Sequence, residues 1–198
     1  MSTGSPTRAA LLELKDERHA MREGYVFLDE KCLLLAGEML RQLRQHATLE
    51  AEMRDAHERA MHALHAALAR HGLQGLQVQP AVDASAASVS RQAGSLMGVR
   101  LQQAKWESPH PETPDSVGAS PELHECRRAF ALLAAASAPL AAVVGNLERL
   151  SQEYRRSVRR ARALQDVLLP ALERDVADIE TRLEELEQQE AVTMRHRA

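Results

Sequence analysis

Aromatic residues are scarce in this 198-residue chain, which contains one Trp, two Tyr and two Phe although 44% of its residues are hydrophobic. The apolar residues are mostly Ala and Leu, and such a composition favours helices and narrow helix–helix seams over a bulky globular core. The only two cysteines, Cys32 and Cys126, stand far apart in the sequence, so we predict no disulfide framework.

Several other features are missing, and each excludes a class of protein. The formal net charge of −3 argues against a general nucleic-acid binder. No run approaches 18 apolar residues, and the N-terminus has no apolar core of the signal-peptide type, so we expect an intracellular protein without membrane insertion. Neither a G-x-x-x-x-G-K-[ST] phosphate loop nor a Ser, Cys or His nucleophile constellation is present. The sequence therefore predicts no enzyme, no cofactor and no bound metal.

A long N-terminal helix is predicted instead. Ser5 is a good N-cap, Pro6 suits the first helical position, and no further proline occurs before Arg70. A helix from Pro6 to Arg70 would be roughly 95 Å long, so we expect a rod rather than a globule. Apolar positions alternate in steps of three and four over four heptads, with one polar exception. They are Leu11, Leu14, Arg18, Met21, Tyr25, Leu28, Cys32, Leu35 and Met39, continuing loosely through Leu43, Met53, Ala60, Leu64 and Ala67.

A second helical segment begins at Ser120 and Pro121, which repeat the same cap signature. Pro139 is expected to kink it, so that its Ala-rich start forms a separate helical piece. The mean step of the second seam is close to 3.5 residues, which favours a left-handed supercoil. That seam contains Leu147, Leu150, Tyr154, Val158, Ala161, Leu164, Leu168, Leu172, Val176, Ile179, Leu183 and Leu186.

Between the two seams lies a segment rich in Gly, Ser, Pro, Ala and Gln. Two apolar pieces in it, LQGLQVQPAV and SLMGVRL, are predicted to pair as a small β-hairpin, and WESPHPETPDSVGAS is predicted to be an exposed loop. The predicted fold is therefore all-α: a long antiparallel two-helix coiled coil with a small irregular or β-hairpin middle. Its parts are an N-terminal helix at 1–70, the middle segment at 71–119 and a C-terminal helical segment at 120–198.

Two residue clusters could carry chemistry. Glu58, His62 and His65 share one helical face, but histidines on an exposed face are far commoner than metal sites, so we predict no metal there. The run YRRSVRRAR could bind nucleic acid, an acidic partner or only solvent. With so few aromatics for base stacking, a salt-sensitive contact with an acidic partner is the better interpretation.

Blocks in both helices and in the middle segment, taken in order, resemble the D subunit of the V-type (archaeal/vacuolar) ATPases, a central-stalk rotor component. The family opening P-T-(K/R)-x-x-L-x-x-L-K matches here from Pro6 to Lys15. The other matching positions are Gly24, Tyr25, Leu28, Lys31, Met97, Gly98, Val99, Arg159, Arg160, Ala163, Leu164, Pro170 and Leu172.

The resemblance implies a non-catalytic rotor shaft that couples ATP hydrolysis or synthesis to proton transport. It implies a cytoplasmic location peripheral to the membrane, a surrounding ring of A and B subunits, the F subunit along the stalk, and a funnel-shaped C/d subunit on the membrane side. Pro170 would bend the shaft, so that its faces differ. The residues expected to contact the ring are Pro6, Thr7, Arg8, Lys15, Arg182 and Arg195, and those expected to contact stalk or membrane-side partners are Leu96, Met97, Gly98 and Val99.

Two alternatives stay open. A generic coiled-coil scaffold or adaptor explains the heptads equally well but not the ordered blocks. A helical hairpin that binds nucleic acid would depend on the arginine run alone.

Overall fold

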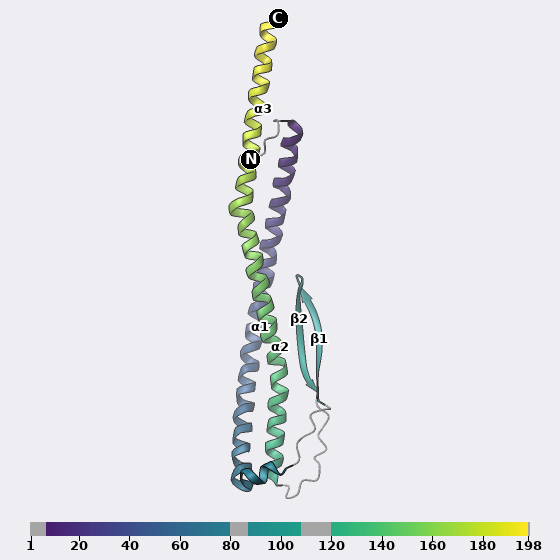
Figure 1. The fold of residues 1–198 in the computed structure, drawn as a ribbon, viewed down its shortest axis with the longest axis vertical. Coiled ribbons are helices and arrows are strands. Elements are labelled where there is room, and N and C mark those ends of the chain that lie inside the picture. The colour runs from purple at the N-terminus through teal and green to yellow at the C-terminus, as the bar shows by residue number, and fades with distance from the viewer. Residues whose placement is uncertain (1–6, 80–86, 108–119, 198) are drawn as a thin grey trace. The chain divides into compact units, whose positions relative to one another are not determined.

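The computed structural model describes residues 7–79, 87–107 and 120–197. Within them, helix α1 (Arg8–Gln77) is followed by strands β1 (Ser88–Leu96) and β2 (Val99–Glu107) and by helix α2 (Pro121–Ala163). A π-helical turn, η2 (Leu164–Leu168), connects α2 to helix α3 (Leu169–Arg197) (Figure 1). The predicted fold class is confirmed: a long helix at each end of the chain and a small antiparallel hairpin in the middle.

The chain divides into two compact units. Unit 1 consists of Met1–Leu34 and Glu153–Ala198 and so contains both ends of the chain. Unit 2 consists of Leu35–Gln152 and contains the rest of α1, the hairpin and most of α2. The division into segments 1–70, 71–119 and 120–198 remains a proposal.

The predicted seam of α1 is confirmed through its four heptads, because every seam position from Leu11 to Met39 is buried or half-buried. Leu35 is fully buried at 0% exposure. The looser continuation is wrong at Leu43, which is 50% exposed, and right at Ala60 and Ala67, which are both fully buried.

Unit 2 has a core of small side chains. Ala60, Ala63 and Ala67 of α1 pack with Cys126 and Ala129 of α2, and half-buried leucines surround this cluster. Small residues let two helices approach closely, which explains how a chain with so few aromatics forms a core. The contact of Cys126, near the start of α2, with this late part of α1 confirms the antiparallel direction of the two helices expected from the sequence.

The ends of the helices follow capping rules. The predicted cap at Ser120 is confirmed: its hydroxyl accepts a hydrogen bond from the Leu123 N–H at 3.2 Å, and α2 begins at Pro121. Ser5 and Pro6 lie outside the described residues. The first described cap of α1 is Thr7, whose hydroxyl accepts a hydrogen bond from the Ala10 N–H at 3.2 Å.

The hairpin forms from different residues than we predicted. SLMGVRL does not pair with LQGLQVQPAV, because Leu73–Gln77 belong to α1 beyond a kink at Gly72 (φ 68°, ψ 168°). Instead, the Met97–Gly98 turn folds β2 back onto β1, from Leu96↔Val99 out to Ser88↔Glu107. A two-residue turn with positive φ matches strand twist, so this local pairing forms more readily than a long-range one. The predicted loop from Trp106 to Ser120 begins inside β2 and ends at the cap of α2, and its residues 108–119 lie outside the described residues.

Two expectations for α2 are wrong. Pro139 does not divide the helix, which continues from Pro121 to Ala163. The segment around Pro139 also contradicts the expectation about apolar runs, because the helical stretch Pro121–His196 contains an 18-residue window apolar enough to cross a membrane by length and composition. Ala129, Ala138 and Val143 of the Ala-rich part are buried in unit 2.

Candidate interaction sites

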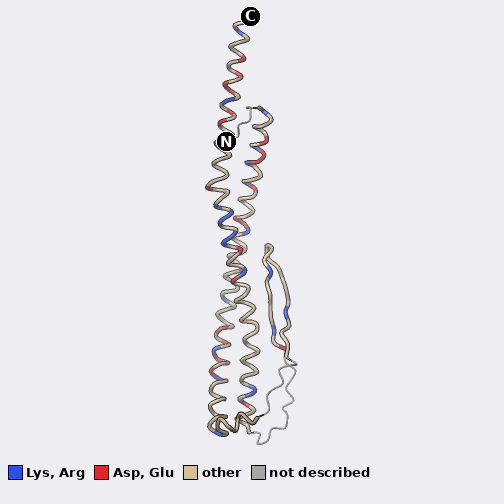
Figure 2. The backbone as a smooth tube through the Cα atoms, viewed as in Figure 1, with Lys and Arg blue, Asp and Glu red and all other residues tan. Residues whose placement is uncertain are grey.

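A row of ion pairs joins α1 to α3 in unit 1. Arg8 pairs with Glu187 at 2.6 Å, Lys15 with Glu180 at 2.6 Å, and Arg22 with Glu173 at 2.7 Å. Both partners advance by seven residues from one pair to the next, so one pair occurs in each heptad of the two helices. Figure 2 shows the opposite charges along these helices. Exposed pairs contribute at most about 1 kcal/mol each, so their main effect is to specify register and antiparallel direction.

A fourth pair in unit 1 is more protected. Lys31 and Glu153 approach to 2.6 Å, and their side chains are only 15% and 20% exposed. The hydrogen bond from Lys31 is the largest influence that lowers the pKa of Glu153, and the nearby charges of Lys31, Arg156 and Arg160 act in the same direction. At neutral pH this carboxylate is therefore ionised and ties α1 to α2.

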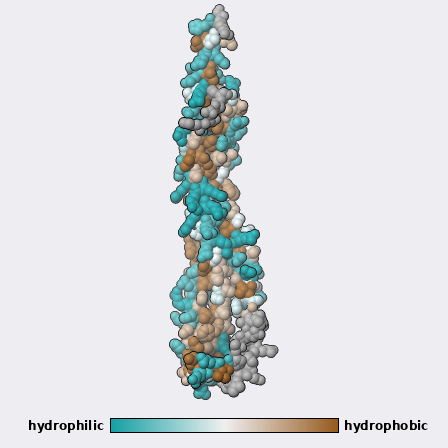
Figure 3. All heavy atoms as spheres, in the orientation of Figure 1, coloured by the Kyte–Doolittle hydropathy of each residue, from teal (hydrophilic) through white to brown (hydrophobic). Residues whose placement is uncertain are grey.

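The six residues predicted to contact a ring do not share one environment in the structure. Arg8 and Lys15 belong to the ion-pair row, Thr7 caps α1, and Pro6 lies outside the described residues. Arg182 and Arg195 are exposed on α3, where every residue from Glu184 to His196 is exposed. At the C-terminal end of α3, hydrophilic side chains cover most of the face visible in Figure 3, interrupted by a few hydrophobic ones.

Pro170 follows a π-helical turn. The Leu169 N–H donates to the carbonyl of Leu164, five residues back instead of four. Pro170 has no N–H of its own, and in a regular α-helix its ring would press on the carbonyl of Asp166. A widened turn at this point relieves that clash.

The π-turn also changes the seam. Leu168 was predicted to lie in it but is 44% exposed, and Val167 is 62% exposed. The half-buried positions here are Leu164, the first residue of the turn, and Leu169, which follows it; they are five residues apart because a π-turn inserts one extra residue. The final predicted position, Leu186, is 42% exposed.

The tip of the hairpin carries the residues predicted to contact stalk or membrane-side partners. Met97 and Gly98 have φ values of 48° and 85°, as expected for a type I′ turn. Val99 is only 7% exposed, whereas Leu96 and Met97 are half-buried and Gly98 is exposed. The tip therefore leaves Leu96, Met97 and Gly98 at least partly accessible, while Val99 is buried beneath the turn.

A buried asparagine of α2 holds the hairpin in unit 2. Asn146 is 2% exposed; its Oδ1 accepts a hydrogen bond from the Gln102 N–H, and its Nδ2 donates one to the Gln102 carbonyl, both at 2.8 Å. Arg149 donates to the Arg100 carbonyl at 2.9 Å and to Asn146 Oδ1 at 2.8 Å. A side-chain amide has the donor and acceptor of a peptide group, so Asn146 pairs with β2 as a neighbouring strand would.

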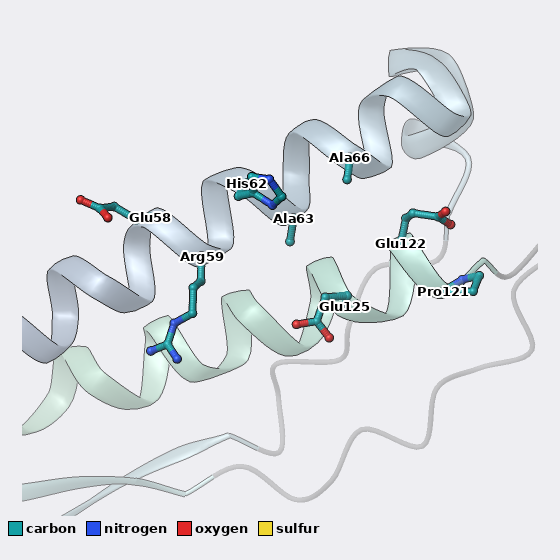
Figure 4. A pocket seen from close by; sticks show the side chains of 8 residues that line it. All are labelled: Glu58, Arg59, His62, Ala63, Ala66, Pro121, Glu122 and Glu125. Carbon is teal, nitrogen blue, oxygen red and sulfur yellow. The ribbon is translucent and has the colours of Figure 1, made fainter.

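A groove of about 710 Å³ lies between α1 and α2 near the start of α2. Figure 4 shows Arg59 reaching from α1 toward α2, whereas Glu58 points away from α2. Glu122 lies in the first turn of α2, where hydrogen bonds from its own N–H and from the Ser120 hydroxyl lower its pKa. Among the described residues, no group of three His, Cys, Asp or Glu side chains is arranged to hold a metal ion.

The arginine run lies on an exposed face of unit 1. Arg155, Arg159, Arg160 and Arg162 are exposed, as is Arg156, which approaches Glu153 at 3.6 Å. The run is therefore accessible to an acidic partner.

Sequence reasoning missed three features of these sites. The heptad spacing of Arg8, Lys15 and Arg22 was present in the sequence and could have been found. So could Asn146, because a lone amide in an apolar helix is a signal for a buried polar contact. The π-turn had only Pro170 as its signal, and a proline alone does not distinguish a π-turn from a kink.

The described part of the chain is a helical hairpin with a small β-hairpin, and ion pairs join its helices, as in a structural protein. The family model for the ATP synthase D subunit matches residues 10–196, so the chain belongs to this family.

Relatives of the chain extend over nearly its full length. It is 24% identical to the V-type ATP synthase D subunit of Thermotoga neapolitana, with 94% of this chain and 92% of the relative covered. It is 29% identical to the V-type ATP synthase D subunit of Anaeromyxobacter dehalogenans (98% and 95% covered). The A-type ATP synthase D subunit of Haloarcula marismortui is 25% identical (96% and 84% covered).

Proposed function

We propose that this D subunit is the non-catalytic rotor shaft in the central stalk of a V-type ATPase. It couples ATP hydrolysis or synthesis in a ring of A and B subunits to proton transport through the membrane. The observation that best supports this proposal is the ion-pair row of unit 1, which holds the start of α1 beside α3 in one register over successive heptads. A helix pair fixed in register can transmit torque without sliding.

The proposed contacts follow from this role. The ends of the chain, with Pro6, Thr7, Arg8, Lys15, Arg182 and Arg195, contact the ring. The hairpin tip contacts stalk or membrane-side partners, among them the F subunit and the funnel-shaped C/d subunit. The chain is cytoplasmic and peripheral to the membrane, which it reaches through the complex. A shaft that made identical contacts with all catalytic sites of the ring could not change the conformation of one site and not the others. Pro170 and its π-turn therefore serve to make the faces of the shaft differ.

The test is reconstitution of the complex with and without this chain. We expect the ring alone to hydrolyse ATP without pumping, and addition of the chain to restore ATP-driven ion transport. The purified chain should neither bind nor hydrolyse ATP. Stoichiometric nucleotide binding in calorimetry, or full pumping without the chain, would contradict the proposal.

A further inference from the structure

The two outer edges of the β-hairpin differ. Because Leu96 and Val99 close a two-residue turn, they form a hydrogen-bonded pair, and every second pair along the ladder does the same. The residues between those pairs direct their N–H and C=O groups outward. On β2 these are Arg100, Gln102, Ala104 and Trp106, and on β1 they are Val89, Arg91, Ala93 and Ser95.

Helix α2 closes the edge of β2. Asn146 satisfies both backbone groups of Gln102, and Arg149 satisfies the carbonyl of Arg100. No further strand can pair with β2 there without displacing these hydrogen bonds. Two of them involve the Asn146 side chain, which is buried at 2% exposure.

The outer edge of β1 is open as far as the described residues are concerned. Among the residues that the structure describes, no backbone or side-chain group bonds to the outward N–H and C=O groups of β1. The strand is nine residues long and exposed along most of its length. An exposed, unpaired edge is a template for an added strand, and proteins usually protect such edges, as α2 protects β2 here.

A cavity of about 330 Å³ lies within unit 2, where α1, both strands of the hairpin and Asn146 of α2 line it, and β1 contributes the stretch from Gln92 to Leu96. Gln42 of α1 lines it and is 3% exposed. Its Nε2 donates to Glu38 at 2.8 Å, but its Oε1 is buried without a partner among the described residues. Such an acceptor costs free energy until a donor reaches it. Gly94 of β1 also lines the cavity, and a Cβ added there would meet nothing within 4 Å.

The charge of the hairpin indicates what the edge would accept. Figure 2 shows basic positions on both strands; they are Arg91, Arg100 and Lys105, against the single acid Glu107. A second copy of β1 added antiparallel near its middle would bring two Arg91 side chains close together, which is unfavourable. An acidic segment is complementary to this surface.

We propose that β1 receives an extended, acidic segment of another polypeptide as a third strand, which places an uncharged hydrogen-bond donor against Gln42 in the cavity. The proposal adds a binding mode to the partner contact proposed for the hairpin tip, and it does not depend on whether the shaft rotates. Main-chain pairing with β1 provides affinity, while the space beside Gly94 and the free Gln42 Oε1 select the inserted side chain.

The test measures amide hydrogen exchange at single-residue resolution in the free chain and in the ATP synthase complex purified from its own cells. In the complex, we expect the outward amides of Arg91, Ala93 and Ser95 to exchange at least about tenfold more slowly than in the free chain. The inward amides of Gln92 and Gly94, already bonded to β2, should change little. Protection with a period of two residues distinguishes strand addition from side-chain docking.

A pair of proline variants provides the control. Ala93→Pro removes an outward N–H of β1, and Ala104→Pro removes an outward N–H of β2 that neither Asn146 nor Arg149 uses. Proline is tolerated at such outward positions of edge strands, so both hairpins should form. We expect only Ala93→Pro to abolish the alternating protection. Gly94→Leu, which places a bulky side chain in the lining of the cavity, should weaken that protection.

The second experiment measures amide exchange of the purified full-length chain with an added peptide. The peptide has blocked ends, is as long as β1, and consists of alternating valine and threonine with glutamate at both ends. It should slow the same outward amides, whereas the counterpart with lysine at both ends should not. Equal protection by both peptides would overturn the proposed acidic character of the added segment, and unprotected β1 amides in the complex would overturn strand addition itself. Concentration-dependent protection of the free chain would show that a second copy occupies the edge, which also overturns it. Failure of the chain to co-purify with ATPase subunits would instead count against the proposed rotor function.

Discussion

The backbone N–H of Leu169 bonds to the carbonyl of Leu164, one residue farther back than an α-helix requires. This single contact reconciles Pro170 with a continuous helical segment, because the wider turn makes room for the proline ring. It also moves Leu168 out of the seam and Leu169 into it.

Pro170→Ala tests whether this turn has a mechanical role. The substitution restores an N–H and removes the need for the widened turn, so we expect unfolding free energy to be unchanged or to rise by up to about 3 kcal/mol. If the turn makes the faces of the shaft differ, the complex should assemble but pump fewer ions per ATP hydrolysed. Thermal melting and ATP-driven pumping in reconstituted complexes measure the two effects. A higher melting temperature with an unchanged pumping ratio would show that the turn is only a tolerated irregularity.

Asn146→Ala should release the hairpin from α2. The substitution leaves the N–H and C=O of Gln102 without partners, so we expect a loss of roughly 1–3 kcal/mol in unfolding free energy. Exchange of the Gln102 amide should accelerate while that of Gly94, which is bonded within the hairpin, should not. Urea denaturation and amide exchange measure these changes. Retained protection of the Gln102 amide would show that Asn146 does not hold β2.

Lys31→Met should change how stability depends on pH. Folding lowers the pKa of Glu153, so its contribution to stability is present above the unfolded value of about 4.3 and is lost as pH falls through the folded value. The variant should therefore be less stable than the parent at neutral pH, by about 1 kcal/mol, and the difference should shrink in acid. Urea midpoints between neutral pH and about pH 3 provide the measurement.

Arg8→Met is the matched control for this experiment. Its ion pair with Glu187 has side chains that are 81% and 60% exposed, so water screens the interaction. We expect its urea midpoint to remain near that of the parent at every pH. A loss equal to that of Lys31→Met would show that burial does not determine the strength of these pairs.

Cys32 and Cys126 should remain free thiols without reductant. Cys32 is half-buried in unit 1 and Cys126 is buried in the alanine core of unit 2, where burial raises the pKa of its thiol. We expect alkylation of the native chain at neutral pH to be slower at Cys126 and complete at both positions after denaturation. Peptide mass spectrometry distinguishes the two sites. Detection of a Cys32–Cys126 bridge in the native monomer would contradict the antiparallel register.

The sequence by itself determined the two long helices, because their seams are local periodic patterns that buried positions such as Leu35 and Leu150 then follow. Capping at Ser120 was equally local, since it depends on the hydroxyl and the proline after it. The tertiary structure decided what depends on distant neighbours. Asn146 faces β2 only because the hairpin packs on α2. Whether Pro170 causes a kink or a π-turn depends on how Leu164 and Leu169 pack against the other helix, which no local pattern specifies.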